Sequence, residues 1–270
     1  MLFDLIKEFN NTQALIQEDP ELAALTEETT KKSWMYSEGF RTESRSVKCQ
    51  EFNVEVTGRG TFEEAALHVG EGRICVLNFA NAYNPGGGVE HGARAQEEDL
   101  CRVSNLYNAI TRRYFRENYY GWNRKHVGDL GTDRLIYSPG VTVFKNDDYS
   151  LKAREDWFRT DVITCAAPML HPERTRLVPR GKLVEAFDSR IVNILETAME
   201  NDVDVLILGA FGCGAFNNPP ALVSECFRYV LLDEGYAKHF KRVIFAIRKG
   251  NWVSRNFDVF SKVLQAPVKQ

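Results

Sequence analysis

Two glycine-rich segments and one acidic cluster hold the residues of this sequence that could do chemistry. Gly86, Gly87 and Gly88 are followed by seven residues and then by Gln96, Glu97, Glu98 and Asp99. Successive glycines let a backbone approach a ligand closely with its amides pointing outward, and the carboxyl groups could present an acid to a sugar. An acidic first turn that complements a helix dipole is a common alternative, and it is the better explanation for the cluster taken alone.

The second glycine segment, from Gly209 to Pro220, carries no charge and follows a strand of buried type. Backbone amides of such a loop, and of the helix expected after it, can hold a phosphate or a diphosphate. No Gly-Lys-Ser/Thr follows, which argues against Mg²⁺–nucleoside triphosphate chemistry, and the pattern is not a dinucleotide fingerprint. Phe211 and Phe216 could stack on a base or a ribose, or could equally be packing residues.

Strands and helices are expected to alternate around these segments. Strands are predicted at residues 49–56, 73–79, 135–137, 141–144, 161–166, 205–209 and 243–247. Helices are predicted at residues 1–17, 61–68, 93–113, 182–201, 220–233 and 255–264, with 19–32 a second helix or a surface connection and 170–181 a flexible loop. Thr61 and Glu64 have the spacing of a capping box. The alternation predicts an α/β fold with a partly parallel sheet, in which both glycine loops could face one cleft.

The composition is that of a soluble globular protein. Of the 270 residues, 44% are hydrophobic and 26% are charged, which excludes general disorder. Lys and Arg number 34 and Asp and Glu 37, so the net charge of −3 argues against bulk electrostatic binding of nucleic acid. No apolar run approaches the roughly 20 residues that span a bilayer. We expect a single domain, in which a helical extension of residues 1–50 packs on a core of residues 51–270.

The cysteines and histidines give no support to a metal or redox site. The 6 cysteines form no C-x-x-C pair, and the 5 histidines share no ligand spacing. Cys213 has no histidine partner in a motif, so it is better explained as a small residue in a tight loop than as a nucleophile. We expect no metal and no cofactor. Scattered thiols, and an N-terminus without the features of a secretory signal, predict a reducing compartment, with the cytoplasm as the default.

The spacing of the glycine triplet and Gln96-Glu97-Glu98 resembles the signature of the poly(ADP-ribose) glycohydrolases. The residues before the triplet, from Asn78 to Pro85, and the later segment from Gly209 to Phe216 are similar to the compact microbial type. The similarity covers most of the chain, more loosely in the N-terminal segment. It implies a macrodomain core, in which a mixed, mostly parallel sheet lies between helices and binds ADP-ribose in a cleft at the strand ends.

The resemblance also implies a role for each matching residue. Glu98 would be the catalytic acid, Glu97 would position the scissile ribose, and Gln96 would help to orient the loop. Asn81 would hydrogen-bond the distal ribose. The glycine triplet Gly86, Gly87 and Gly88 would contact the diphosphate and the reacting ribose. A second diphosphate loop would be formed by Gly212, Gly214, Ala215 and Phe216, and the phenyl ring of Phe216 would cover the ligand.

The implied reaction is hydrolysis of the ribose–ribose O-glycosidic bonds of poly(ADP-ribose), which releases ADP-ribose. Such a bond needs a proton on the leaving oxygen, and one carboxyl can donate it and then accept a proton from water. The short chain leads us to expect cleavage at polymer ends. Two alternatives stay open: a macrodomain that binds ADP-ribose without cleaving it, and a hydrolase of mono-ADP-ribosylated targets such as ADP-ribosylated proteins.

Overall fold

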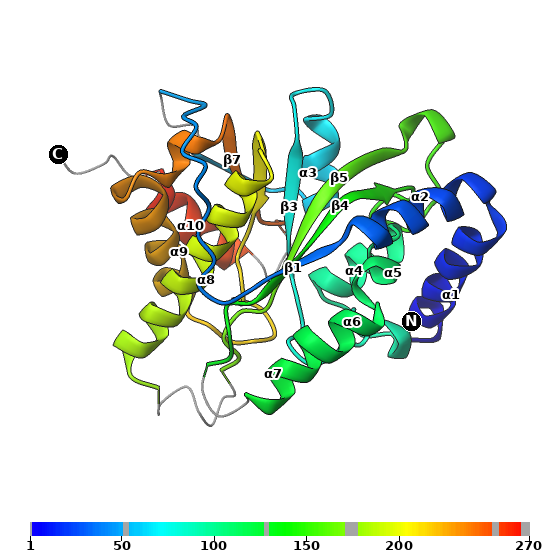
Figure 1. Cartoon of the computed structure of the whole chain (residues 1–270), viewed down its shortest axis with the longest axis horizontal. Coiled ribbons are helices and arrows are strands. Elements are labelled where there is room, and N and C mark those ends of the chain that lie inside the picture. The colour runs from blue at the N-terminus through cyan, green and yellow to red at the C-terminus, as the bar shows by residue number, and fades with distance from the viewer. Residues whose placement is uncertain (1, 51–53, 127–129, 171–177, 250–253, 266–270) are drawn as a thin grey trace.

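A computed structural model of the chain describes residues 2–50, 54–126, 130–170, 178–249 and 254–265. A seven-stranded sheet runs through its centre in the order β1-β4-β5-β3-β6-β7-β2 (Figure 1). The strands are β1 Trp34–Tyr36, β2 Val54–Thr57, β3 Ile74–Phe79, β4 Leu135–Val143, β5 Phe158–Cys165, β6 Val205–Leu208 and β7 Arg242–Ala246. β4 pairs antiparallel with β1 and β5, and the remaining pairs are parallel. The prediction of a mixed, mostly parallel sheet is therefore confirmed.

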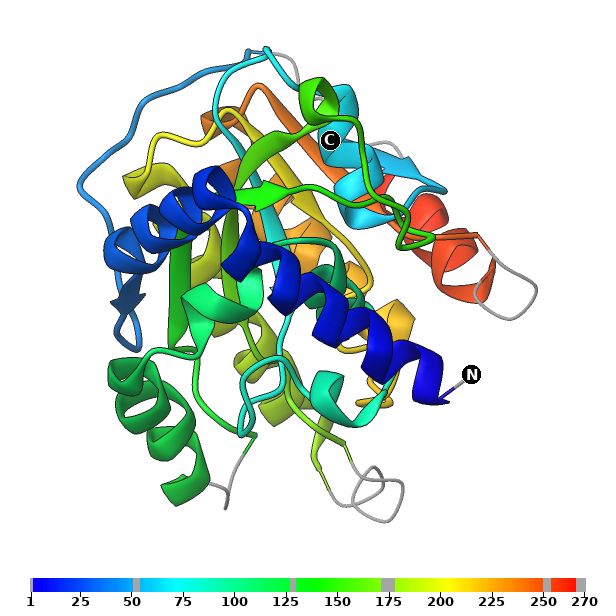
Figure 2. The ribbon, with the colours of Figure 1, turned by 90° about the vertical axis from the view of Figure 1, so that its right-hand side faces the viewer.

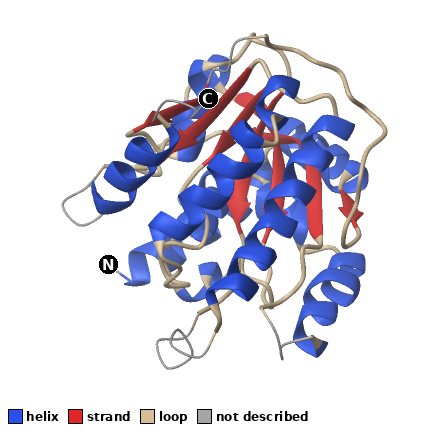
Figure 3. Cartoon of the chain, turned by 90° about the vertical axis from the view of Figure 1, so that its left-hand side faces the viewer, coloured by secondary structure: helices blue, strands red, loops and turns tan. Residues whose placement is uncertain are grey.

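Helices cover both faces of this sheet. One face is covered by α8 Arg180–Glu200, α9 Pro220–Arg228 and α10 Ser254–Leu264 (Figure 3). The other face is covered by α3 Thr61–Leu67, α4 Gln96–Val103 and α5 Leu106–Ile110, against which α1 Leu2–Glu18 and α2 Pro20–Lys32 pack (Figure 2). The short helices α6 Arg113–Phe115 and α7 Gly121–Lys125 follow α5. None of the described helices is long and apolar enough to cross a bilayer.

The strand β3 shows why the sequence signal for a central strand was clear. Ile74 and Val76 pack with α3, α4 and α5, whereas Cys75 and Leu77 point to the opposite face and join the core under α8 and α9. All four side chains are buried. A strand that is covered on both faces reads as a continuous apolar run instead of an alternating one.

The prediction of one helix over residues 93–113 is wrong, because this segment is divided into α4, α5 and the start of α6. Ser104 follows α4 with an extended backbone (φ −148°) and pairs with Val143 in a β-bridge. The side-chain oxygen of Asn105 accepts a hydrogen bond from the Thr142 amide at 2.9 Å. These bonds to β4 replace the helical ladder, so tertiary contacts end α4 where the sequence pattern alone would have continued it.

Smaller differences concern element ends. Gly60, rather than Thr61, is the N-cap of α3, and its amide donates to Glu63 at 3.1 Å, so the capping box predicted between Thr61 and Glu64 is wrong. The predicted strands at residues 135–137 and 141–144 are one strand, β4, with an irregularity between Ser138 and Val141. The N-terminal segment, expected to be helical, also contributes the edge strand β1.

Two predictions reach beyond the described residues. Of the strand predicted at residues 49–56, the structure describes β2 from Val54 onward, and residues 51–53 lie outside the described part. Residues 171–177 of the loop predicted at 170–181 also lie outside the described part.

Candidate active site

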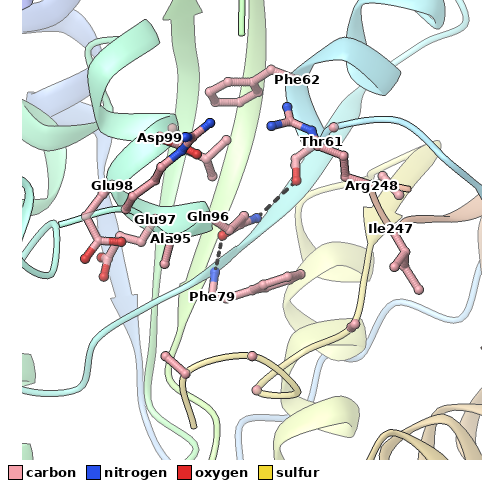
Figure 4. Close-up of a pocket in the computed structure, with 18 of the residues that line it drawn as sticks. Thr61, Phe62, Phe79, Ala95, Gln96, Glu97, Glu98, Asp99, Ile247 and Arg248 are labelled. Carbon is pink, nitrogen blue, oxygen red and sulfur yellow. Dashed lines mark hydrogen bonds between the residues drawn. The ribbon is translucent and has the colours of Figure 1, made fainter. Parts of the chain in front are cut away.

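A cavity of about 630 Å³ lies at the carboxyl ends of β3, β6 and β7 (Figure 4). β3 leads into the glycine triplet and α4, and β6 leads into the second glycine segment. Of the residues assigned to a site from the sequence, those that line the cavity are Asn81, Gln96, Glu97, Glu98, Gly212, Gly214, Ala215 and Phe216. Gly86, Gly87 and Gly88 are not among the described residues of its wall. The expectation that both glycine loops face one cleft is confirmed for the second loop, whereas the first reaches the cavity through the flanking residues Asn81 and Gln96 to Glu98.

Two carboxyl groups enter the cavity wall from the first turn of α4, and a different backbone amide holds each of them. Glu97 Oε2 accepts a hydrogen bond from the Asn81 amide at 2.7 Å, and its Oε1 accepts one from Asn78 Nδ2 at 3.3 Å. Glu98 Oε1 accepts a hydrogen bond from the Gly88 amide at 2.9 Å. Both side chains are buried, and their carboxylates lie side by side (Figure 4). The loop between β3 and α4 therefore fixes both acids.

Burial dominates the electrostatics of Glu97. The pKa of Glu97 is raised to about 8, first by burial and then by the adjacent Glu98 carboxylate, while the hydrogen bonds from Asn81 and Asn78 oppose the rise. A carboxyl group with this pKa is mostly protonated at neutral pH, so it can donate a hydrogen bond and carries no charge. Glu97 is thus suited to holding a hydroxyl group beside Glu98.

The glycine triplet leaves no room for side chains around these acids. Gly87 has a φ of +61°, and a Cβ atom there would collide with Glu98 Oε1. Gly86 has a φ of +71°, and its Cβ would lie 2.7 Å from the ring of Tyr107. A Cβ on Gly88 would stand 2.8 Å from the methyl group of Ala93. Positive φ values and these short approaches together explain why the bend is built from glycine.

Gln96 fastens the beginning of α4 to two neighbouring elements. Its Oε1 accepts a hydrogen bond from the Phe79 amide at 2.8 Å. Its Nε2 donates to the Leu77 carbonyl at 2.8 Å. The same nitrogen donates to Thr61 Oγ1 at 3.2 Å (Figure 4). One carboxamide thus uses its acceptor and both donors to join α4, β3 and α3. The position of the two acids depends on this junction because they follow directly in the chain.

Asn81 lines the cavity, and its side-chain carbonyl oxygen already accepts hydrogen bonds from within the protein. Its side-chain oxygen accepts hydrogen bonds from the amides of Tyr83 at 2.8 Å and Asn84 at 3.0 Å, which stabilises the turn before the glycine triplet. The side-chain nitrogen is the group of this residue that can still serve a ligand as a donor.

The second glycine segment closes the opposite side of the cavity with backbone. Gly212 has a φ of +73°, and a Cβ there would lie 2.5 Å from Ala167 Cβ and 2.6 Å from Asn218 Nδ2. Gly214 and Ala215 are exposed, and Phe216 is half-buried at the cavity wall. An uncharged loop with an accessible main chain is typical of sites that hold phosphate groups through backbone amides.

The burial of Phe211 and of Cys213 decides between a structural and a functional role, which the sequence had left open for each residue. Phe211 is fully buried, and its ring packs against Phe79 and Phe187 at centroid distances of 5.9 and 6.1 Å, so it is a packing residue. Burial raises the pKa of the Cys213 thiol to about 12, which leaves almost no thiolate at neutral pH and excludes it as an activated nucleophile.

The far end of the cavity is formed by residues that sequence reasoning missed. Arg59, Thr61 and Phe62 contribute from the start of α3, Asp147 from the β4–β5 connection and Arg248 from the end of β7. Asp147 and Arg248 form an ion pair; burial raises the pKa of Asp147, although Arg248 opposes the rise. These residues meet only through the sheet topology. The available signal was their place after strand ends, where α/β folds bind ligands.

Comparisons with known proteins place this geometry in a family. The family model described as microbial-type PARG, catalytic domain, matches residues 7–146, more than half of the chain. A search of curated proteins finds no match. Among solved structures, poly(ADP-ribose) glycohydrolase (PARG) from Thermomonospora curvata has 27% identity and a TM-score of 0.84, covering 97% of this chain and 99% of its own.

Two further solved structures hold ligands. The Thermomonospora curvata enzyme bound to the inhibitor ADP-HPD has 28% identity and a TM-score of 0.83, over 96% of this chain and 99% of its own. PARG from Deinococcus radiodurans in complex with ADP-ribose has 32% identity and a TM-score of 0.77, over 92% of this chain and 98% of its own. The chain therefore belongs to the microbial-type PARG catalytic-domain family, as the Gly-Gly-Gly and Gln-Glu-Glu signature had indicated.

Proposed function

We propose that the protein is a poly(ADP-ribose) glycohydrolase that hydrolyses the ribose–ribose O-glycosidic bonds of the polymer and releases ADP-ribose. The similar structures carry this activity in their names, and two of them hold the inhibitor ADP-HPD or ADP-ribose. The observation that carries the proposal for this chain is the Glu98 carboxyl group, which lines the cavity and is fixed by the Gly88 amide at 2.9 Å. A glycosidic reaction needs a positioned proton donor of this kind.

Glu98 acts first as an acid and then as a base in this proposal. Its proton passes to the leaving ribose oxygen while the bond from that oxygen to the anomeric carbon breaks, and positive charge develops on the ribose that stays bound. The anionic diphosphate of the ligand helps to stabilise that charge. Water then attacks the anomeric carbon and gives its proton to Glu98. Oε1 is engaged by Gly88, and no described residue donates a hydrogen bond to Oε2, so we assign the proton to Oε2.

Glu97 and Asn81 hold the sugar in this proposal. Because its pKa is raised to about 8, Glu97 is protonated and can donate a hydrogen bond to a hydroxyl group of the scissile ribose. Asn81 offers its side-chain nitrogen to the distal ribose. These two donors would hold the sugar so that the scissile ribose presents its anomeric carbon to water in a fixed orientation. Such positioning contributes to the rate.

The second glycine segment holds the diphosphate in this proposal. Its exposed main chain at Gly214 and Ala215 supplies amides, together with the buried Gly212 of the cavity wall, and Phe216 covers the ligand. We also propose that the Gly86–Gly88 backbone approaches the diphosphate and the reacting ribose once the ligand is bound. The contacts of the triplet with Glu98 support at least a positioning role for it.

We further propose that cleavage proceeds from polymer ends. A cavity of about 630 Å³ is of the size that encloses one nucleotide-sized ligand, so a single terminal unit would fill it. Polymer carrying a label at one end tests this directly. An end-cleaving enzyme yields ADP-ribose from the first minutes with no intermediate oligomers, whereas oligomers at early times would contradict the proposal.

The decisive experiment is the Glu98→Gln variant, studied by polymer digestion and by calorimetric titration with ADP-ribose. We expect release of ADP-ribose to be abolished while the dissociation constant of ADP-ribose stays within about tenfold, or ~1.4 kcal/mol. Turnover retained in the variant would contradict the role of Glu98. A wild-type protein that binds ADP-ribose but digests nothing would be a reader, and preference for mono-ADP-ribosylated protein over polymer in parallel digests would indicate the third alternative.

Three further assignments accompany this proposal, and they concern the fold, the carrier of the polymer and the cellular compartment. We infer that the core is a macrodomain, which the mixed sheet between helices and the cavity at the strand ends support. We infer that ADP-ribosylated proteins carry the polymer to the site. We infer a reducing compartment such as the cytoplasm, since Cys75, Cys101, Cys165, Cys213 and Cys226 are free thiols.

A further inference from the structure

We propose that the N-terminal helix α1 fixes the loop whose Gly88 amide holds the acid Glu98, and that Arg102 is a positioning residue for Glu98. The inference rests on the proposed function, because it concerns the same carboxyl group. None of the described residues of α1 lines the cavity, so the helix has no direct part in binding a ligand there. It nevertheless supports both ends of the segment formed by residues 86–93, which we call the catalytic loop.

Arg102 connects α1 to the far end of the catalytic loop. It lies one turn after Glu98 on α4, and its side chain is fully buried. Nη2 donates to the Ala93 carbonyl at 2.5 Å, and Nε donates to the Leu5 carbonyl of α1 at 3.3 Å. Nη1 donates to Asp99 Oδ1 at 3.3 Å. Burying a guanidinium is costly unless it is hydrogen-bonded, so these three contacts define where the group and its partners can sit.

From Ala93 the contact continues to the acid itself. The Ala93 amide donates to the Gly88 carbonyl at 3.1 Å. Its methyl group also packs so closely on Gly88 that a Cβ there would be only 2.8 Å away. The Gly88 amide in turn donates to Glu98 Oε1 at 2.9 Å. A series of hydrogen bonds thus runs from α1 through Arg102, Ala93 and Gly88 to Glu98.

The near end of the catalytic loop is supported through aromatic rings. Phe9 of α1 is buried, and its ring meets the ring of Tyr107 edge-on at 4.9 Å. The Tyr107 ring packs against Gly86, where a Cβ would lie 2.7 Å from it. The hydroxyl group of Tyr107 donates to Glu90 Oε1, within the same loop, at 2.8 Å. One helix therefore braces the loop at its beginning and at its end.

The helix is itself locked to α4 by a buried hydroxyl group. Thr12 Oγ1 is fully buried; it donates to the Arg102 carbonyl at 2.5 Å and accepts from Lys145 Nζ at 2.8 Å. Leu5, Phe9 and Thr12 share one face of α1, since they are spaced at i, i+4 and i+7. Ile16, in contrast, packs in a separate apolar cluster with Leu22 and Phe144, and its side chain makes none of the hydrogen bonds of this series.

The test compares Thr12→Val and Arg102→Lys with the control Ile16→Ala, at a temperature where all three proteins are folded. Thr12→Val removes the hydrogen bond from Thr12 of α1 to the Arg102 carbonyl of α4, and lysine cannot reproduce the three-way fork of Arg102. We expect both variants to lower kcat on polymer by about tenfold or more, with KM and the ADP-ribose dissociation constant within about threefold. Ile16→Ala removes buried apolar surface from α1 but none of these hydrogen bonds, and it should leave kcat within about twofold.

Hydrogen exchange supplies a second readout. In Thr12→Val, the amides of residues 86–95 should exchange faster than in the wild type, while in Ile16→Ala they should not. The proposal would be contradicted if kcat fell in proportion to thermal stability in all three variants. It would also be contradicted if the exchange rates of residues 86–95 in Thr12→Val equalled those of the wild type. Absence of polymer turnover by the wild type would contradict the proposed function instead, and the exchange data would still decide on the role of α1.

Discussion

A methyl group on Gly87 would collide with Glu98 Oε1, so the glycine bend and the acid fill complementary space. The neighbouring Gly88 amide donates to that same oxygen at 2.9 Å. The bend therefore both supports the carboxyl group and limits where it can go. Any side chain added here must move the acid, the backbone or both.

Gly87→Ala should consequently lower kcat by about a hundredfold, because displacement of a reacting group by about 1 Å has an effect of that order. The left-handed backbone should also cost about 1–2 kcal/mol of stability. Gly39→Ala is the matched control: Gly39 has a φ of +64° but nothing within 4 Å of the added Cβ. We expect Gly39→Ala to show the loss of stability that comes from the left-handed backbone alone, with unchanged kcat. Steady-state kinetics and urea unfolding of both variants make the comparison, and similar kcat values would refute the collision.

The raised pKa of Glu97 predicts a pH dependence of stability. The folded-state value of about 8 lies above the ordinary value of 4.5, so the folded protein keeps a proton that the unfolded chain loses. The corresponding stability is fully present below pH 4.5 and is lost as the pH rises through 8. Glu97→Gln cannot ionise and still offers an oxygen to the Asn81 amide.

The free energy of unfolding of the wild type, relative to that of Glu97→Gln, should therefore fall by a few kcal/mol between about pH 5 and about pH 8. Calorimetric unfolding of both proteins across this range measures the difference. A difference that does not change with pH would show that Glu97 is ionised in the folded protein, and it would remove the proposed hydrogen bond from Glu97 to the ribose.

The site could be predicted from the sequence where its signal is local. The spacing of the glycine triplet and Gln96-Glu97-Glu98 places the acids at a strand end, because a bend and a helix start are set by residues close in the chain. The end of α4 could not be predicted, since it depends on the bond between Asn105 and Thr142 of a distant strand. For the same reason the sequence could not predict the pairing of Asp147 with Arg248, because they become neighbours only when the sheet is complete.

Gln96 should behave as a structural junction. Gln96→Leu leaves the Phe79 amide and the Leu77 carbonyl without their partner, and we expect a loss of about 1–3 kcal/mol in the free energy of unfolding. A double-mutant cycle with Thr61→Val isolates the third bond and should give a coupling energy of about 0.5–1.5 kcal/mol. Urea unfolding of the four proteins measures both values. Additive effects would show that the bond from Gln96 to Thr61 contributes no stability.

Phe211 and Phe216 should separate folding from binding, although they lie five residues apart in the same segment. Phe211 is fully buried against Phe79 and Phe187, so Phe211→Ala should cost about 3–5 kcal/mol of stability. Phe216 is half-buried at the cavity wall, so Phe216→Ala should change stability much less. If its ring covers the ligand, the dissociation constant of ADP-ribose should rise about tenfold or more, as expected for the loss of a stacking contact. Thermal unfolding and calorimetric titration separate the two effects, and unchanged affinity in Phe216→Ala would remove the ring from the binding site.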